Sequence, residues 1–458
     1  MSQGMAGQLH NIPAVSNVIL HAFDWTYQSI AEQAEQIAAL GYRSVLVSPA
    51  MKSLQLPSGT QWWQRYQPQD YRLIDNPLGN TSDFKHMIER LAEFNLWVYV
   101  DVVFNHMANE SDIRADLQYP NRWDREDYEK DPTKYHALML FGDLSEPLFT
   151  EPDFVDAFGI ENWNDKWEVQ NGRISGGPHD PGLPTLIDNE HVVEQQRAYL
   201  LALKSMGVKG FRIDAAKHMS LEHLNKVWTD DITNDVHIFG EIITDGGATK
   251  EEYETFLSPY LMGTTLGAYD FPLFNILYQA FEKKGSLTSL IDPYCYGLAL
   301  SPLRAITFAI THDIPNNQVF KSLVMSEHNE WLAYAYLFGR EGGIPLVYSD
   351  LDTSGITNSF GSPRWKNAWK EEKMSGLIHF HHRMYGEGQT LIEASDDHLV
   401  FARGDQGIVA LNKSNKNIEV SMSSDSEWRE FSSNQLCQKK EGVLVFSIPK
   451  YSYLLLCH

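Results

Sequence analysis

Three acidic residues stand at the ends of three separate apolar runs of the chain, where buried strands are expected to finish. These residues are Asp214, Glu241 and Asp313. In a barrel of parallel strands, residues at the carboxyl ends of the strands face one common site. Cleavage of a glycosidic bond needs one protonated and one ionised carboxyl group beside the same linkage. The three residues therefore predict an active site for that chemistry.

The neighbours of each carboxyl group indicate which one would be ionised. Arg212 lies two residues before Asp214 on the same predicted strand, so both side chains project to one side. A guanidinium there favours the charged carboxylate, and we assign Asp214 as the nucleophile. Glu241, in the sequence FGEII, has apolar neighbours and no adjacent cation. Burial would raise the pKa of Glu241, which suits a general acid. Asp313, beside His312, would then stabilise the positive charge of the transition state.

A purely structural role for these residues stays open at this point. A single Asp at the end of a strand is more often a helix cap or a loop hydrogen-bonding residue than a catalyst. The joint pattern of three carboxyl groups on three strands favours catalysis.

Short apolar runs alternate with longer amphipathic stretches over the first 350 residues. This alternation indicates parallel strands with crossover helices, and its length to about residue 380 fits an α/β fold of the (β/α)8 TIM barrel type. The expected strands are 18–20, 44–47, 97–103, 210–214, 237–241, 305–310 and 344–348, and the expected helices are 30–40 and 83–94.

Two segments depart from the alternation. No clean helix is expected for some 80 residues after the third strand, a stretch rich in Asp, Asn, Pro, Gly and Trp. From about residue 398, the runs LVFARG, GIVALNKS, GVLVFSIP and YSYLLLCH are separated by turn residues, which is typical of antiparallel strands. We expect the barrel at 1–104 and 187–385, an irregular inserted domain at 105–186 and an antiparallel β domain at 386–458.

Composition excludes several classes of function. The net charge of −23 argues against nucleic acid and against anionic membrane surfaces, whereas a neutral polysaccharide is indifferent to that charge. No apolar run approaches the roughly 20 residues that span a bilayer. The three cysteines include no CxxC pair and predict no disulfide framework. We expect a monomer.

The first 17 residues, MSQGMAGQLHNIPAVSN, lack the basic and apolar regions of a signal peptide. We therefore expect a cytoplasmic protein, with a secreted protein trimmed before this sequence as the alternative.

Four segments carry a resemblance to a known family. DVVFNH (101–106), GFRIDAAKH (210–218), FGEI (239–242) and AITHD (309–313) resemble, in order, the characteristic segments of the α-amylases among (β/α)8-barrel glycoside hydrolases. The resemblance extends from Val18 through the C-terminal domain. It implies a retaining enzyme that cleaves internal α-1,4 bonds of starch-like glucans and maltooligosaccharides. It also implies Asp214 as nucleophile, Glu241 as acid/base and Asp313 as stabiliser of the transition state.

The same resemblance implies a set of substrate contacts. The stretch WWQRYQP (62–68) is similar to animal-type and related bacterial members, with Tyr66 stacking on the sugar at the cleavage point and two Trp as platforms. A buried loop anchor is the alternative for this stretch, although its Gln- and Pro-rich setting favours exposure. Lys217 and His218 would face the leaving-group side. The expected substrate-binding residues are Trp62, Trp63, Tyr66, Gln67, His106, Arg212, Lys217, His218 and His312.

Family members commonly hold a structural calcium between barrel and insertion. Asn105 and the backbone oxygen of His218 match two of its ligands, but Thr185 stands where an Asp is expected. Because calcium favours charged oxygen ligands, this exchange should weaken the site, and calcium stays an open alternative with Asp188 as a possible substitute. Some members also bind chloride. Arg212 matches one of its ligands, but Thr311 replaces an expected Asn, so we expect no chloride.

Other functions share this chemistry or this fold. An exo-acting, maltooligosaccharide-forming hydrolase or an α-glucan transglycosylase would use the same three carboxyl groups. A non-catalytic carbohydrate-binding protein on the same barrel is a remote alternative, because such proteins usually lose a catalytic carboxylate.

Overall fold

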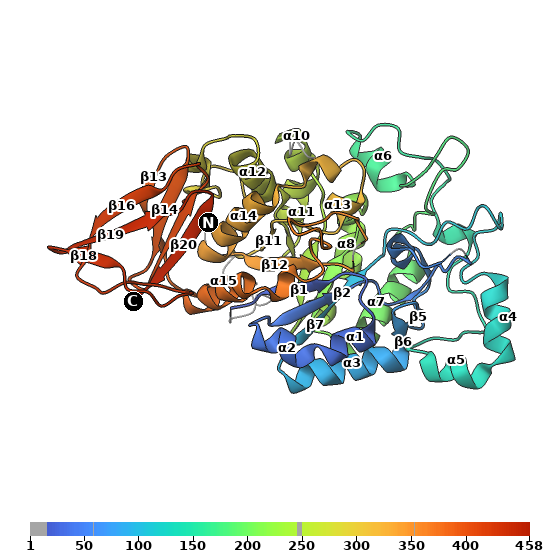
Figure 1. Cartoon of the computed structure of the whole chain (residues 1–458). Coiled ribbons are helices and arrows are strands. Elements are labelled where there is room, and N and C mark those ends of the chain that lie inside the picture. The colour runs from blue at the N-terminus through green and yellow to red at the C-terminus, as the bar shows by residue number, and fades with distance from the viewer. Residues whose placement is uncertain (1–15, 58, 245–249, 352) are drawn as a thin grey trace.

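Eight parallel strands close into a barrel at the centre of the molecule (Figure 1). The computed structural model describes residues 16–57, 59–244, 250–351 and 353–458. Around the barrel, the strands follow one another in chain order, and the last strand pairs with the first. They are β1 (Ile19–Ala22), β2 (Ser44–Val47), β7 (Trp97–Val102), β8 (Gly210–Ile213), β9 (His237–Gly240), β10 (Gly267–Tyr269), β11 (Ala305–Phe308) and β12 (Ile344–Ser349).

The strand register brings the site residues together. Asp101 of β7 lies opposite Arg212 of β8, and Arg212 lies opposite Phe239 of β9. Strands buried on both faces are expected to be nearly continuous apolar runs, so the two charged residues within them are exceptions that need partners. The register places those partners on neighbouring strands.

Seven of the eight strands were predicted, and the sequence analysis missed β10. This strand has three residues, GAY, which is too short to form a recognisable apolar run. The predicted helix at 30–40 is divided into α1 (Tyr27–Glu32) and α2 (Ala34–Ala39), because the backbone leaves the helical conformation at Gln33. The second predicted helix, α3 (Thr81–Glu93), begins at a capping box formed by Asn80 and Asp83.

Helices cover the outside of the barrel (Figure 1). Their apolar faces join the strands in one large core that extends into the C-terminal domain. The longer ones after α3 are α7 (Glu190–Ser205), α8 (Leu221–Val227), α12 (Phe271–Phe281), α14 (Glu327–Gly339) and α15 (Glu372–Arg383).

The segment between β7 and α7 leaves the barrel as a separate lobe (Figure 1). The expectation that it lacks clean helices is wrong, since it carries α4 (Arg122–Lys130), α5 (Pro132–Leu138) and α6 (Lys166–Asn171). The α4 sequence, RWDREDYEK, buries only Tyr128, so it has no apolar stripe by which a sequence pattern could reveal it.

The C-terminal residues form two antiparallel sheets. One has the strand order β13-β14-β15-β20-β17 and the other β16-β19-β18. The four apolar runs correspond to β14 (His398–Arg403), β15 (Gly407–Asn412), β19 (Val443–Ile448) and β20 (Ser452–Cys457). The remaining strands are β13 (Gln389–Ala394), β16 (Ile418–Ser423), β17 (Arg429–Glu430) and β18 (Gln438–Lys440). An apolar cluster that includes Trp428 and Phe446 belongs to these sheets alone.

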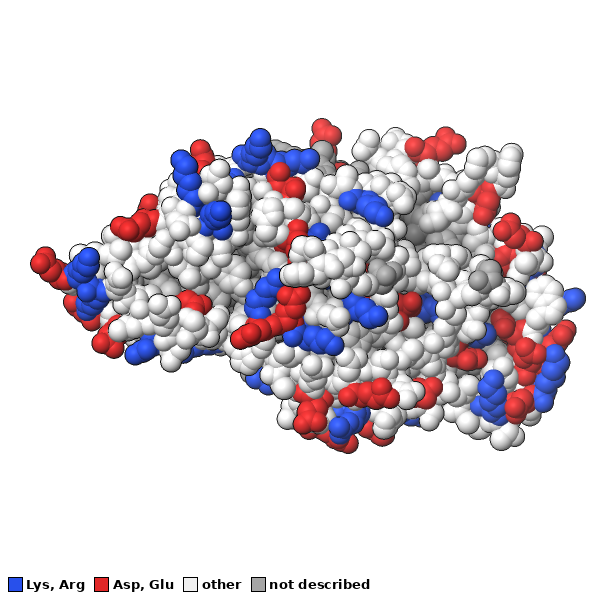
Figure 2. Space-filling model, viewed as in Figure 1, with Lys and Arg blue, Asp and Glu red and all other residues white. Residues whose placement is uncertain are grey.

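The surface carries both signs of charge. On the face in Figure 2, Lys and Arg side chains lie among Asp and Glu side chains rather than in one basic patch. The three cysteines are free. Among the described residues, none of the helices combines the length and apolarity needed to cross a bilayer. The amino-terminal segment discussed above lies almost wholly outside the described residues.

Gly240 tests how tightly the barrel holds the strand that carries Glu241. A Cβ at Gly240 would lie 2.7 Å from the Tyr260 hydroxyl and 3.1 Å from the Ala216 Cβ. We expect Gly240→Ala to lower the free energy of unfolding by about 1–3 kcal/mol, because the added methyl group would force the surrounding side chains or backbone to move. The melting temperature measured by calorimetry checks this.

Gly376→Ala is the matched control. Gly376 lies within α15, where an added Cβ would meet only the Ser432 Oγ at an ordinary 3.5 Å. Because Ala favours a helix over Gly by about 1 kcal/mol, this variant should melt at the same temperature or higher. Equal melting of both variants would contradict the packing argument.

Candidate active site

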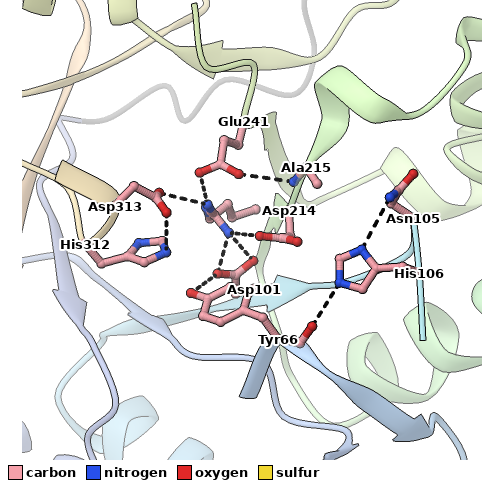
Figure 3. Close-up of polar contacts among 10 residues, drawn as sticks. Tyr66, Asp101, Asn105, His106, Asp214, Ala215, Glu241, His312 and Asp313 are labelled. Atoms are coloured by element: carbon pink, nitrogen blue, oxygen red, sulfur yellow. Dashed lines mark hydrogen bonds and ion pairs between the residues drawn. The ribbon is translucent and has the colours of Figure 1, made fainter. Parts of the chain in front are cut away.

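One buried guanidinium lies at the centre of the acidic residues at the carboxyl ends of the barrel strands (Figure 3). The Arg212 Nη1 lies 2.7 and 2.6 Å from the two carboxylate oxygens of Asp101 and 3.1 Å from the Asp214 Oδ1. Its Nη2 contacts the Glu241 Oε1 and lies 3.9 Å from the Asp313 Oδ2. The three predicted catalytic carboxyl groups are therefore brought together, with Asp101 as a fourth.

The contact between Arg212 and Glu241 corrects the sequence analysis, which expected no cation beside Glu241. The two residues lie 29 positions apart in the chain, and only the pairing of β8 with β9 makes them neighbours. The other Glu241 oxygen, Oε2, accepts a hydrogen bond of 3.2 Å from the backbone N–H of Ala215. Glu241 is thus held at both oxygens.

Ala215 contacts one of the catalytic candidates, and sequence reasoning missed this contact. Its backbone has φ 49° and ψ 34°, a left-handed conformation that costs a residue with a Cβ roughly 1–2 kcal/mol. This turn directs the Ala215 N–H toward Glu241. Backbone strain of this kind often marks a functional site, but no residue type in the sequence announces it.

The pKa values of three carboxyl groups are raised. Burial raises the pKa of Asp101 to about 6, although Arg212 opposes the shift. Burial also raises the pKa of Asp214 well above its ordinary value, against Arg212. Burial and the neighbouring Glu241 do the same for Asp313. Arg212 favours the ionised form of Asp214, as the sequence analysis expected, but burial outweighs that attraction and raises the pKa.

Tyr66 and His312 form one wall of the site. Their rings stack at 5.3 Å and 12°, and Phe23 stacks on His312 at 4.7 Å. The Tyr66 hydroxyl donates a hydrogen bond of 2.9 Å to Asp101. The His312 Nε2 lies 3.4 Å from the Asp313 Oδ1, and burial lowers the pKa of His312 well below its ordinary value. This histidine is uncharged at neutral pH.

His106 is fixed behind Tyr66. Its Nε2 lies 2.9 Å from the Tyr66 backbone oxygen, and its Nδ1 lies 3.3 Å from the Asn105 amide nitrogen. Burial lowers the pKa of His106 to about 4, so it is neutral at pH 7. The nearby Gln67 accepts a hydrogen bond from the backbone N–H of Asn109 and so ties the loop to the insertion.

The residues that follow Asp214 contact the inserted lobe and the chain after β9. Lys217 is buried, pairs with Glu252 at 3.2 Å and lies over the ring of Phe256. His218 donates from Nδ1 to the Val169 backbone oxygen at 2.9 Å. Both side chains are thus already engaged, one by the barrel and one by the insertion.

Aromatic rings that reach solvent lie on the short helix after β3 (Lys52–Ser53) and on the insertion. Trp62 is half-buried, and Trp63 is 37% exposed on the short helix η1 (Trp62–Tyr66). Trp163 of the insertion is 48% exposed and lies edge-on to His218 at 5.8 Å. The sequence analysis missed Trp163, because only the folded insertion brings it beside the residues after Asp214.

Neither Thr185 nor its possible substitute Asp188 offers a free acidic ligand for calcium. The Thr185 hydroxyl donates to the Gly172 backbone oxygen at 3.1 Å, so it acts as a donor where a metal needs an acceptor. Asp188, the possible substitute, pairs with Lys226 at 2.9 Å. Within the described part of the chain, no three His, Cys, Asp or Glu side chains gather as a metal site.

A closed parallel barrel whose strand ends bring several carboxyl groups around one point has the features of a barrel-type glycoside hydrolase site. The family model described as "Alpha amylase, catalytic domain" matches residues 24–260. An α-amylase of Aeromonas hydrophila is 47% identical over 409 residues, which cover 89% of this chain and 87% of that protein. The chain therefore belongs to the α-amylase family, whose members act on α-glucans, and it is a glycoside hydrolase.

Solved structures share the fold at lower sequence identity. Wild-type α-amylase I from Eisenia fetida has a TM-score of 0.75 at 20% identity and covers 97% of both chains. A cyclomaltodextrin glucanotransferase with three domains has a TM-score of 0.71 at 18% identity, covering 96% of this chain and 99% of that one. Since an amylase and a glucanotransferase share the fold, the fold alone does not decide between hydrolysis and transfer.

The raised pKa values predict the acid side of the pH–activity profile. Attack needs an ionised carboxylate at Asp214, and a raised pKa means that this carboxylate is lost at a higher pH than usual as the solution is acidified. We expect kcat/KM on soluble starch to fall with decreasing pH with a midpoint clearly above the ordinary carboxyl value of about 4. A midpoint at or below that value would contradict the shared-guanidinium account.

Proposed function

We propose that this enzyme hydrolyses internal α-1,4-glucosidic bonds of starch-like glucans with retention of anomeric configuration. The observation that carries the proposal is the shared guanidinium. Asp214 and Glu241 both contact Arg212 from adjacent strands, so their carboxyl groups stand beside each other at the mouth of the barrel. Two close carboxyl groups favour the retaining mechanism, which needs a nucleophile within reach of the anomeric carbon.

The proposed reaction has two steps. Asp214 attacks the anomeric carbon while Glu241 gives its proton to the departing glycosidic oxygen, and a covalent glycosyl–Asp214 ester forms. Glu241, now ionised, then removes a proton from water, which attacks the same carbon and releases Asp214. The roles follow the family segments that these residues match. Asp313, close to both, stabilises the positive charge that develops on the sugar.

Burial shifts the ionisation of three of the carboxyl groups around Arg212. Four carboxyl groups face one guanidinium, and the pKa values of Asp101, Asp214 and Asp313 are raised by burial. Asp101, Asp214 and Asp313 therefore ionise at a higher pH than isolated carboxyl groups do. His106 and His312 are neutral and add no positive charge that would drive those protons off.

Endo action is supported by where the exposed rings lie. Trp63 stands on η1 beside Tyr66, and Trp163 stands on the insertion beside His218. Exposed aromatic faces stack on the apolar faces of sugars, and rings on two separate elements suit a chain that continues past the cleavage point. An exo-acting hydrolase or a transglycosylase would use the same carboxyl groups, and its products over time separate it from the endo enzyme.

Substitution of the two central carboxyl groups tests the proposed roles. We expect Asp214→Asn to abolish turnover of starch and of 4-nitrophenyl α-maltoside alike, because both need the nucleophile. Glu241→Gln should lose about 10²–10⁴-fold on starch but much less on formation of 4-nitrophenolate, which leaves without a proton. Rates of reducing-end release and of nitrophenolate release are the measurements.

The order of these effects decides the assignment. Greater loss on the nitrophenyl substrate for Glu241→Gln than for Asp214→Asn would reverse the two roles. Wild-type release of reducing ends no faster than Asp214→Asn would overturn the proposed function itself. Proton NMR of the first product should show the α anomer, and the β anomer would exclude retention.

Trp163→Ala tests endo action on long chains. We expect loss of this platform to raise KM for amylose by about 5- to 100-fold, as expected for one stacking contact of roughly 1–3 kcal/mol, and to alter maltotriose cleavage little. In wild type, the viscosity of amylose should fall early relative to reducing ends. One dominant short product from the start would indicate exo action.

Trp123→Ala is the matched control. Trp123 is 43% exposed on α4 of the same insertion, which Figure 1 places at the outer end of the lobe. This variant should keep the KM of wild type on both substrates. An equal rise in KM for the two variants would show a general effect on the insertion rather than a glucan contact.

A further inference from the structure

Thr185 is buried in the segment by which the inserted lobe returns to the barrel, at the position where the family resemblance expects a calcium carboxylate. Thr185 is 2% exposed, and its hydroxyl lies 3.1 Å from the Gly172 backbone oxygen and 3.5 Å from that of Leu183. A hydroxyl carries one proton, so the closer carbonyl is its principal acceptor. This bond ties the end of α6 to the segment that returns to the barrel.

Further direct bonds connect the same segments. Backbone N–H groups of Met107 and Leu186 donate to the carbonyls of Pro184 and Asn105 at 3.0 and 2.9 Å, which pairs the strand exit with the returning segment. From α6, the Gln170 amide donates to the Met219 carbonyl at 3.1 Å. The chain after the nucleophile is also joined to α6 by the bond from His218 to Val169.

Carboxylates on the returning segments are committed elsewhere. Asp188 pairs with Lys226 at 2.9 Å. Asp153 accepts a bond of 2.9 Å from the Asn189 amide and another of 2.9 Å from the backbone N–H of Thr150. Asp180 accepts from the Asn109 amide and from the backbone N–H of Gly182. The charged oxygen ligands on which calcium affinity depends are therefore used within the protein.

A hydroxyl and a carboxylate act oppositely at such a junction. A carboxylate beside backbone carbonyls repels them unless a cation lies between, whereas a Thr hydroxyl donates to a carbonyl directly. Thr185 bonds the Gly172 carbonyl directly in a buried place, where leaving that carbonyl unpaired would cost about 1–3 kcal/mol.

We propose that direct hydrogen bonds, made by Thr185 within the insertion and by Gln170 and His218 between the insertion and the barrel, take the place of calcium, so that the stability and activity of this enzyme do not depend on that ion. The inference concerns the junction and does not rest on the proposed endo action. Its first readout is thermal unfolding, which would respond to calcium whatever the substrate is.

The first experiment compares the full-length protein in a chelator and in calcium. Protein treated with EDTA and dialysed should show the same melting temperature in EDTA as in millimolar CaCl₂, with unchanged hydrolysis of soluble starch. MgCl₂ serves as the control for general ionic effects. A melting temperature that rises with CaCl₂ but not with MgCl₂, or activity that EDTA removes and CaCl₂ restores, would overturn the proposal.

The second experiment removes the hydroxyl alone. Thr185→Val keeps the shape and loses the donor, and we expect its melting temperature to fall by about 1–3 °C, because leaving the buried acceptor unpaired costs about 1–3 kcal/mol and a chain of this length shifts by about 1 °C per kcal/mol. Thr185→Ser keeps the donor and should recover most of the loss. Calcium should not raise the melting temperature of either variant.

Thr307→Val is the matched control. Thr307 is also buried, within β11, and its hydroxyl oxygen meets no hydrogen-bond partner among the residues that the structure describes. Its replacement should therefore leave the melting temperature near that of wild type. A Thr185→Val protein that melts no lower than Thr307→Val would show that the hydroxyl does not hold the junction.

Discussion

The site depends on a single buried positive charge. Arg212 is fully buried in the barrel, and an unpaired guanidinium there would be strongly destabilising. Its partners come from three further strands or their ends, through Asp101, Glu241 and Asp313, besides Asp214 from its own. The barrel register that satisfies this charge is the same register that gathers the carboxyl groups, so stability and catalysis share one constraint.

That constraint accompanies raised pKa values at three of the carboxyl groups. Because one cation is divided among four acids, burial outweighs attraction at Asp101, Asp214 and Asp313, and their pKa values rise. The pKa values of His106 and His312 are lowered instead, since burial disfavours the charged form of an imidazole. The insertion places Trp163 beside His218, and the Thr185 hydroxyl bonds the Gly172 carbonyl within that lobe without a charged group.

Much of the fold could be predicted because its strands are apolar runs buried on both faces. Such runs are visible in the sequence, as β7 and β12 are, and so are the four C-terminal runs that became β14, β15, β19 and β20. The missed elements lack that signal. β10 has three residues, and α4 buries one side chain, so their conformation comes from neighbours and caps rather than from a local pattern.

The sequence by itself determined which residue types stand at the strand ends, and with them the catalytic candidates Asp214, Glu241 and Asp313. Only the tertiary structure decided how they interact. Arg212 reaches Glu241, the Ala215 N–H turns toward that carboxyl, and Thr185 donates to Gly172 because strand pairing and packing set distances between residues far apart in the chain. Spacing along a strand indicates which side a residue faces, but the closure of the barrel decides what lies across from it.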